Sequence, residues 1–168
     1  IMAIGFKYTP YQLEKDVKKK STKKSTSTMP TLEEANKALG ITNGASHSEY
    51  KITDDGDIYV IEIGGRMGGD FIGSDLVRLS TGYDFVKGVI DVALGTFNEP
   101  KLTESKYSGV YFLCKETEYL LPYFANANNI EGVVMYEQTD TELRNISCSA
   151  DRSGYLIYKG ENKLNLVE

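Results

Sequence analysis

The stretch SEYKITDDGDIYVIEIGGRMGG at residues 48–69 decides the fold, because it has the alternation of two strands joined by a tight turn. The dipeptide Asp55-Gly56 suits a two-residue hairpin loop, in which both loop positions need a positive φ. Counting outward from that loop predicts that Glu49 faces Glu62, with a two- or four-residue turn centred on Asp55-Gly56 between the strands. Residues that face each other directly share one side of the hairpin, with Cβ atoms roughly 4.5–5.5 Å apart, where like charges repel. The pattern therefore indicates a positive group between the two carboxylates.

The same count predicts the other pairs of the hairpin. His47, the only histidine of the chain, shares the face of Glu49. Nearer the turn, the count pairs Thr53 with Ile58, Ile52 with Tyr59, Lys51 with Val60, and Tyr50 with Ile61.

Composition narrows the class of protein. A chain of 168 residues fits one domain, or one domain with a small appendage. A net charge of −5 argues against a general nucleic-acid or membrane-surface partner. No apolar run has the roughly 20 residues that span a bilayer, and no signal peptide is visible. Cys114 and Cys148 lack a zinc-binding pattern, so we expect a reduced, cytoplasmic protein.

Periodicity and turn residues predict an α+β fold. Residues 14–28 are basic and rich in hydroxyl groups, which predicts a mobile loop. Apolar spacing and capping residues, including Asp84 as an N-cap and Gly82 and Gly95 as stops, predict helices at 31–40, 74–82 and 84–95. Besides the hairpin, strands are predicted at 1–9, 108–116, 118–124, 132–138 and 153–160. We expect one domain at 1–100, an antiparallel sheet with helices, and a small β-rich domain at 101–168.

The opposed glutamates predict a cation site. Carboxylate oxygens suit Mg²⁺, which prefers one or two carboxylates together with substrate phosphates and water. The alternative is that Glu49 and Glu62 are exposed side chains that splay into solvent.

The loop GGRMGGD that follows the second strand predicts an anion-binding segment. Its four glycines let a ligand approach the backbone and leave N–H groups available to an anion. Arg66 can bind a carboxylate or phosphate through two parallel hydrogen bonds. The alternative is a flexible turn with a solvated arginine. The spacing fits neither a dinucleotide-binding GxGxxG motif nor a P-loop.

Residues 39–95 resemble the C-terminal half of an ATP-grasp domain, and in particular the carboxylate–amine ligases and the carbamoyl-phosphate-synthase-like members of that family. The resemblance also extends, less strongly, to DRSGYLIYKG at residues 151–160. The matching positions, in order, are Gly44, His47, Glu49, Gly56, Glu62, Arg66, Gly68, Gly69, Thr81-Gly82, Asp84 and Ala93-Leu94-Gly95.

The resemblance implies a role for each matching site residue. Glu49 and Glu62 correspond to the ligands of Mg²⁺ (or Mn²⁺) that hold the phosphates of ATP. Arg66 corresponds to the catalytic arginine that steadies the substrate carboxylate or its acyl phosphate. His47, Gly68 and Gly69 correspond to substrate-binding positions. The family has an asparagine ligand where this chain has Gly64, so we expect reduced coordination or coordination completed by water.

The resemblance covers only the back half of such an enzyme, because the nucleotide-enclosing parts of the family have no counterpart here. We therefore expect a C-terminal fragment of an ATP-dependent ligase that acts through an acyl phosphate. Its expected partners are small-molecule carboxylate and amine substrates and the missing N-terminal half, with a homodimer left open. The alternatives are a non-catalytic metal- or ligand-binding module, or an interaction domain without a site.

Overall fold

The structure, a computed structural model, describes residues 3–6, 32–55 and 58–166. It contains two compact units, each discontinuous in sequence. Unit 1 consists of Ile1–Tyr8, Ser74–Tyr83 and Lys101–Glu168, and unit 2 of Thr9–Gly73 and Asp84–Pro100. The loop predicted at 14–28 lies outside the described residues, and the domain boundary at residue 100 stays a prediction.

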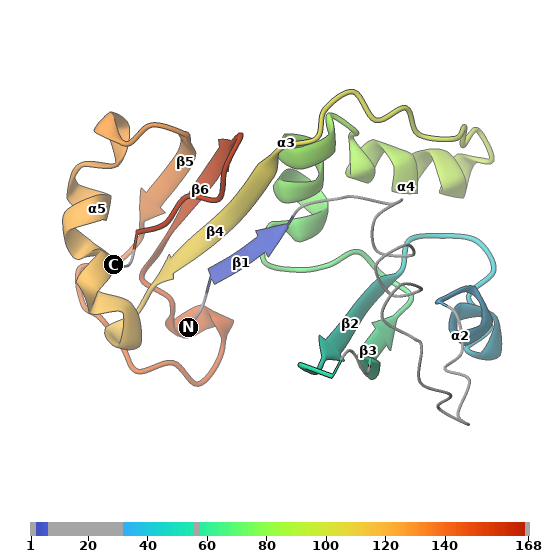
Figure 1. The fold of residues 1–168 in the computed structure, drawn as a ribbon, viewed down its shortest axis with the longest axis horizontal. Coiled ribbons are helices and arrows are strands. Elements are labelled where there is room, and N and C mark those ends of the chain that lie inside the picture. Colours follow the sequence, from blue (N-terminus) through green and yellow to red (C-terminus); the bar gives the residue numbers. More distant parts are fainter. Residues whose placement is uncertain (1–2, 7–31, 56–57, 167–168) are drawn as a thin grey trace. The chain divides into compact units, whose positions relative to one another are not determined.

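Unit 1 is built on a four-stranded antiparallel sheet with the strand order β1-β4-β6-β5 (Figure 1). The α+β class with antiparallel pairing is therefore confirmed. Four of the strands expected outside the hairpin are present. They are β1 (Ala3–Phe6), β4 (Tyr107–Leu113), β5 (Val133–Gln138) and β6 (Gly154–Gly160).

The centre of this sheet is buried on both faces. Neighbouring residues of a strand point to opposite faces, and both Val110 and Tyr111 of β4 are buried. On the face of Tyr111, the short helices η2 (Lys115–Leu120) and α5 (Leu121–Ala125) contribute to the core. That core contains Tyr111, Leu113, Leu120, Phe124, Ala127, Leu156, Tyr158 and Leu166.

The strand predicted at 118–124 is wrong, because this segment is helical. Leu120 at the end of η2 and Phe124 in α5 are both buried, and their spacing of four residues fits the period of a helix. Pro122 lies in the first turn of α5, where its missing N–H costs no hydrogen bond. Aromatic and leucine content favoured a strand, but the burial period of the segment is helical.

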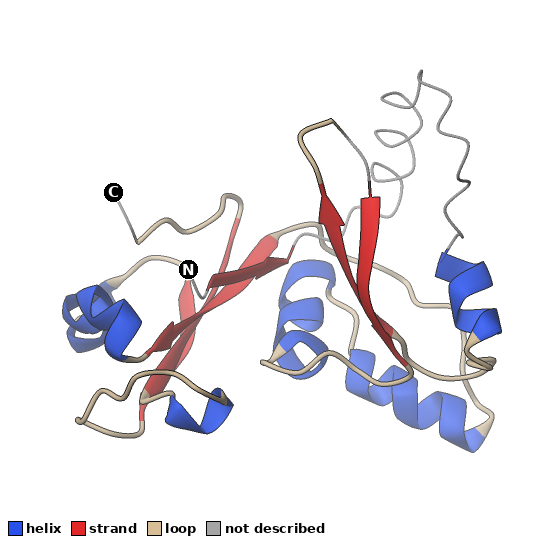
Figure 2. Ribbon diagram, turned by 90° about the horizontal axis from the view of Figure 1, so that it is seen from below, coloured by secondary structure: helices blue, strands red, loops and turns tan. Residues whose placement is uncertain are grey.

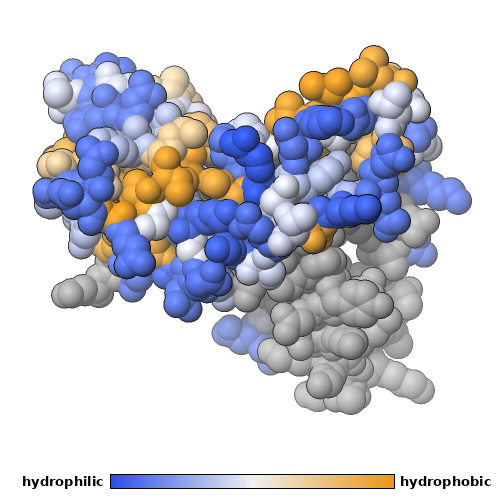
Figure 3. All heavy atoms as spheres, turned by 90° about the horizontal axis from the view of Figure 1, so that it is seen from above, coloured by the Kyte–Doolittle hydropathy of each residue, from blue (hydrophilic) through white to orange (hydrophobic). Residues whose placement is uncertain are grey.

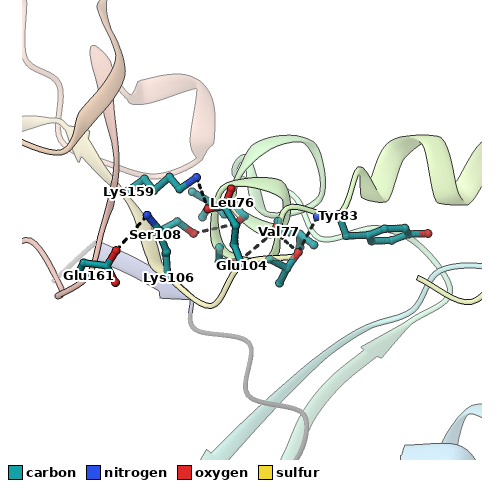
Figure 4. A network of polar contacts seen from close by, with 10 residues as sticks. Leu76, Val77, Tyr83, Glu104, Lys106, Ser108, Lys159 and Glu161 are labelled. Carbon is teal, nitrogen blue, oxygen red and sulfur yellow. Dashed lines mark hydrogen bonds and ion pairs between the residues drawn. The ribbon is translucent and has the colours of Figure 1, made fainter. Parts of the chain in front are cut away.

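A polar network ties α3 (Val77–Thr81) to the sheet of unit 1 (Figure 4). The hydroxyl of Ser108, which is fully buried, donates to the carbonyl oxygen of Leu76 at 2.8 Å. Nearby, Lys159 lies 2.5 Å from Glu104 and lowers the pKa of that carboxyl. These contacts give the polar groups beside the buried strand the partners that burial requires.

Unit 2 contains the hairpin of β2 (His47–Ile52) and β3 (Ile58–Gly64) with the helices α2 (Leu32–Ala38) and α4 (Phe85–Leu94) (Figure 2). The predicted N-cap of α4 is confirmed, since Asp84 accepts a hydrogen bond from the backbone of Lys87 at 2.9 Å. Gly95 ends α4 in the left-handed region. None of the described helices has the length and apolarity to cross a membrane.

Helix α4 also has an apolar face at the surface. Ile90 and Leu94, four residues apart, are exposed, and apolar side chains gather over this helix in the space-filling view (Figure 3). Phe85, Val89 and Val92 lie on the predicted apolar side and are half-buried.

The hairpin pairs the two glutamates as predicted, but its register nearer the turn differs from the prediction. Glu49 faces Glu62, whereas Tyr50 faces Val60 rather than Ile61. Ile61 is therefore the extra residue of a β-bulge, which shifts every pair on the turn side by one residue. Ile52 faces Ile58, so residues 53–57 join the strands, in place of the expected turn of two or four residues. Gly56 lies outside the described residues.

A loop of unit 1 predicts a pH-dependent stability. The Asp151 carboxylate accepts hydrogen bonds from the Ser147 hydroxyl, the Ser147 amide and the Cys148 amide, which lower its pKa to about 2. A lowered pKa in the folded state stabilises the fold above about pH 4, and that stabilisation is lost as the pH falls toward about 2. Asp151→Asn should therefore lower the melting temperature at pH 7, and the difference should shrink between about pH 4 and pH 2.

Thermal melts across this pH range test the prediction. The same substitution at Asp54, an exposed residue near the hairpin turn, serves as a control for the change of an aspartate to asparagine at the surface. A melting-temperature difference for Asp151→Asn that stays constant from pH 7 to pH 2 would contradict the assignment.

Candidate functional site

Two carboxylates face each other across the hairpin of unit 2. Glu49 of β2 and Glu62 of β3 are direct cross-strand partners, so their side chains lie on the same face. Their side chains are 52% and 49% exposed, respectively, which leaves both open to a ligand. Like charges at this position destabilise a hairpin unless a positive group or a ligand offsets them.

Each carboxylate has one neighbouring nitrogen donor from the predicted site residues. Arg66 donates from Nη2 to Oε1 of Glu62 at 2.9 Å and from Nη1 to the carbonyl of Met67 at 3.0 Å. The Nε2 atom of His47 lies 3.2 Å from Oε1 of Glu49. The structure thus brings four of the predicted site residues together on the hairpin and the loop that follows it.

The glycine loop contributes its residues unequally. A Cβ atom placed on Gly68 would lie 2.9 Å from Nδ1 of His47 and 3.0 Å from the side chain of Ile72. A Cβ atom on Gly69 would meet nothing within 4 Å. Gly68 is therefore packed against the site, whereas Gly69 is exposed, with free space beside its Cα, although its carbonyl oxygen accepts a hydrogen bond from the Ile72 amide at 2.8 Å.

Two further features of the loop are not predictable from the sequence. Asp70 and Phe71 have φ angles of 52° and 65°, in the left-handed region that side chains rarely adopt. Such strain costs on the order of 1 kcal/mol or more per residue and tends to concentrate at binding sites. No sequence signal marks it, because neither residue is a glycine. Ile72, which packs at Gly68, was likewise not identified.

The donor set fits a small hard cation that keeps other ligands. Among the described residues, no cluster of three or more His, Cys, Asp or Glu side chains is arranged to hold a metal. Within this same part of the chain, His47 and Arg66 bond only the Oε1 atoms, which leaves Oε2 of Glu49 and of Glu62 for a cation. Two carboxylates with water and substrate oxygens are a common set for Mg²⁺.

Comparisons with known proteins agree on one fold. Residues 5–75 match the sequence model of the ATP-grasp domain family. The chain is similar to phosphoribosylglycinamide synthetase from Anaerococcus prevotii, with a TM-score of 0.60, 20% identity, and coverage of 95% of this chain and 40% of that one. It is also similar to an L-amino acid ligase from Bacillus licheniformis, with a TM-score of 0.57, 21% identity, and coverage of 80% and 38%.

The chain spans about 40% of the length of these solved structures, and at this identity the similarity establishes the fold. No curated protein matches the sequence.

The ion pair between Arg66 and Glu62 is exposed, with side-chain exposures of 57% and 49%. Exposed pairs of this kind contribute about 0–1 kcal/mol to the free energy of unfolding. We therefore expect Arg66→Ala to lower that free energy by less than about 1 kcal/mol, as measured by urea denaturation. A loss of several kcal/mol would mean that Arg66 serves the fold rather than a ligand.

Proposed function

We propose that this chain, whose residues 5–75 match the sequence model of the ATP-grasp domain family, is the C-terminal part of an ATP-dependent ligase that joins a carboxylate to an amine. Two solved relatives named as a synthetase and as an L-amino acid ligase support this reaction class. The coverage of about 40% of those proteins supports a chain that completes its site with a further, N-terminal part.

The observation that carries the proposal is the cross-strand pair of Glu49 and Glu62. Like-charged neighbours on an exposed hairpin repel each other. A divalent cation that binds between them would be coordinated by both carboxylates and would offset this repulsion. Glu49 and Glu62 would each contribute a carboxylate oxygen to Mg²⁺. The bound ion would neutralise negative charge on the phosphate oxygens of ATP during transfer.

The proposed reaction has two steps. A carboxylate oxygen of the substrate attacks the γ-phosphorus of ATP, the bond to the β-phosphate oxygen breaks, and ADP leaves an acyl phosphate behind. The amine then attacks the acyl carbon, phosphate departs, and the nitrogen loses a proton. Splitting the reaction in this way replaces a poor leaving group, oxide, by phosphate.

Arg66 is the proposed catalytic residue of this chain. Its guanidinium lies beside Glu62, half-exposed, and presents a planar fork that can hold a carboxylate or acyl phosphate through two hydrogen bonds. The charge of the guanidinium would stabilise negative charge that builds on the transferring group. The exposed residue Gly69 is a proposed contact for the same substrate.

Replacement of Arg66 by lysine tests the proposed role. Lysine keeps the charge but loses the planar fork, so Arg66→Lys should remove about 2–4 kcal/mol of transition-state stabilisation, or about 30- to 1,000-fold in turnover. The measurement is steady-state ADP formation by the full-length enzyme, with a panel of amino acids supplied as carboxylate and amine.

A Mg²⁺ titration supplies the control for that experiment. Glu62→Gln should also lower turnover, and excess Mg²⁺ should partly restore it, because the variant weakens metal binding. The loss in Arg66→Lys should not respond to Mg²⁺. Turnover near the wild-type value in Arg66→Lys would contradict a catalytic role and would mean that Arg66 is a solvated turn residue.

Gly64 offers a gain-of-function test of the metal site. A Cβ atom at this position would have only ordinary contacts, the nearest at 3.5 Å to Arg66, so a side chain fits. Asparagine would add an amide oxygen beside the two carboxylates, as the resemblance to the family suggests. Gly64→Asn should therefore bind Mn²⁺ roughly several-fold more tightly than the wild type. Gly69→Asn, away from the carboxylates, is the matched control, and equal affinities in both variants would contradict the assignment.

A further inference from the structure

The only histidine of the chain lies at the edge of the proposed metal pair, and its side chain is better buried than its partner. His47 is 17% exposed, whereas Glu49 is 52% exposed. Their contact joins Nε2 to Oε1 over 3.2 Å. A half-exposed glutamate has several rotamers available in solution, so a packed imidazole can restrict the direction in which its carboxylate points.

The contact with Glu49 determines which nitrogen of the His47 ring carries the proton. An ionised carboxylate only accepts hydrogen bonds, so Nε2 of His47 must be the donor to Glu49. In the neutral ring, the other nitrogen, Nδ1, then carries a lone pair and no proton. That Nδ1 atom faces Gly68.

Gly68 supplies the space that this ring orientation needs. A Cβ atom at residue 68 would lie 2.9 Å from Nδ1, a separation that real Cβ atoms essentially never show, and 3.0 Å from two side-chain atoms of Ile72. The contact with Nδ1 is the shortest of the three and the one under 3.0 Å, so we expect the imidazole to shift first. Gly69, the next residue, has no such contact.

We propose that His47 is a positioning residue for Glu49, and that Gly68 is a glycine because any side chain there would displace the His47 ring. His47 then acts on Glu49 as Arg66 acts on Glu62, each holding one Oε1 atom while the Oε2 atoms remain for the cation. This assignment differs from the substrate contact that the family resemblance implies for His47. Its metal-binding part rests on the function proposed above.

Nuclear magnetic resonance of the histidine ring tests the orientation without any activity. Because the chain has one histidine, long-range ¹H–¹⁵N spectra in alkaline buffer report its tautomer without ambiguity. The wild type and Gly69→Ala should show a single form with the proton on Nε2. Glu49→Ala and Gly68→Ala should shift toward the tautomer mixture of a free imidazole. A mixture in the wild type, or an unchanged ring in both altered variants, would overturn the proposal.

The test remains decisive if one variant folds poorly. Backbone amide spectra and thermal melts establish whether Gly68→Ala keeps the fold. Glu49 is half-exposed, so Glu49→Ala should fold, and this variant alone decides whether the carboxylate fixes the ring.

Mn²⁺ titration, followed by broadening of the amide signals of Glu49 and Glu62, tests the metal-binding part. His47→Ala should weaken binding by about tenfold, the usual scale for loss of a group that orients a ligand. His47→Gln, whose amide can donate from near the place of Nε2, should recover part of that loss. Wild-type binding that is unchanged in His47→Ala would overturn the role of His47 alone. A wild-type protein that takes up no Mn²⁺ would overturn the proposed function as well.

Discussion

The charge repulsion between Glu49 and Glu62 is the constraint on which the candidate site depends. The hairpin places the two carboxylates opposite each other, and three kinds of group offset the resulting charge. Arg66 bonds one oxygen of Glu62, His47 bonds one oxygen of Glu49, and the remaining oxygens suit a divalent cation. The glycine loop that follows β3 fits the same arrangement, because Gly68 leaves room for the histidine ring. The hairpin and the glycine loop therefore position one cluster of charged side chains together.

The pairing of the two glutamates was predictable from the sequence. The strand register from which it was predicted nevertheless contains two errors, which cancel at this pair. The two-residue turn was wrong, since Ile52 faces Ile58, and the pairs near the turn are shifted by one residue. The bulge at Ile61 then restores the expected pairing at Glu49 and Glu62. A bulge has no strong sequence signature in a run of β-branched residues, so period-two alternation could not reveal it. Helix ends were more predictable, because caps such as Asp84 act through local hydrogen bonds.

Some features of the structure depend on tertiary contacts, and local sequence patterns did not predict them. Residues 118–124 have strand-like composition, yet burial of Leu120 and Phe124 on one side of a helix determines their structure. The left-handed backbone at Asp70 and Phe71 likewise has no signal in the residue types. The role of Gly68 could be suspected from its place in a glycine loop, but its contact with His47 required coordinates. Residue types and spacing thus predicted that Glu49 and Glu62 lie opposite each other, and packing determined how the neighbouring side chains are oriented.

A double-mutant cycle on metal affinity tests the central claim, that one divalent cation binds to both carboxylates together. Calorimetric Mn²⁺ titrations would compare the wild type with Glu49→Gln, Glu62→Gln and the variant carrying both substitutions. If the two side chains share one ion, each single substitution should cost nearly as much affinity as the pair, so the effects are strongly non-additive. Effects that simply add, or affinities that do not change, would contradict a shared site and leave the opposed glutamates as an exposed feature of the hairpin.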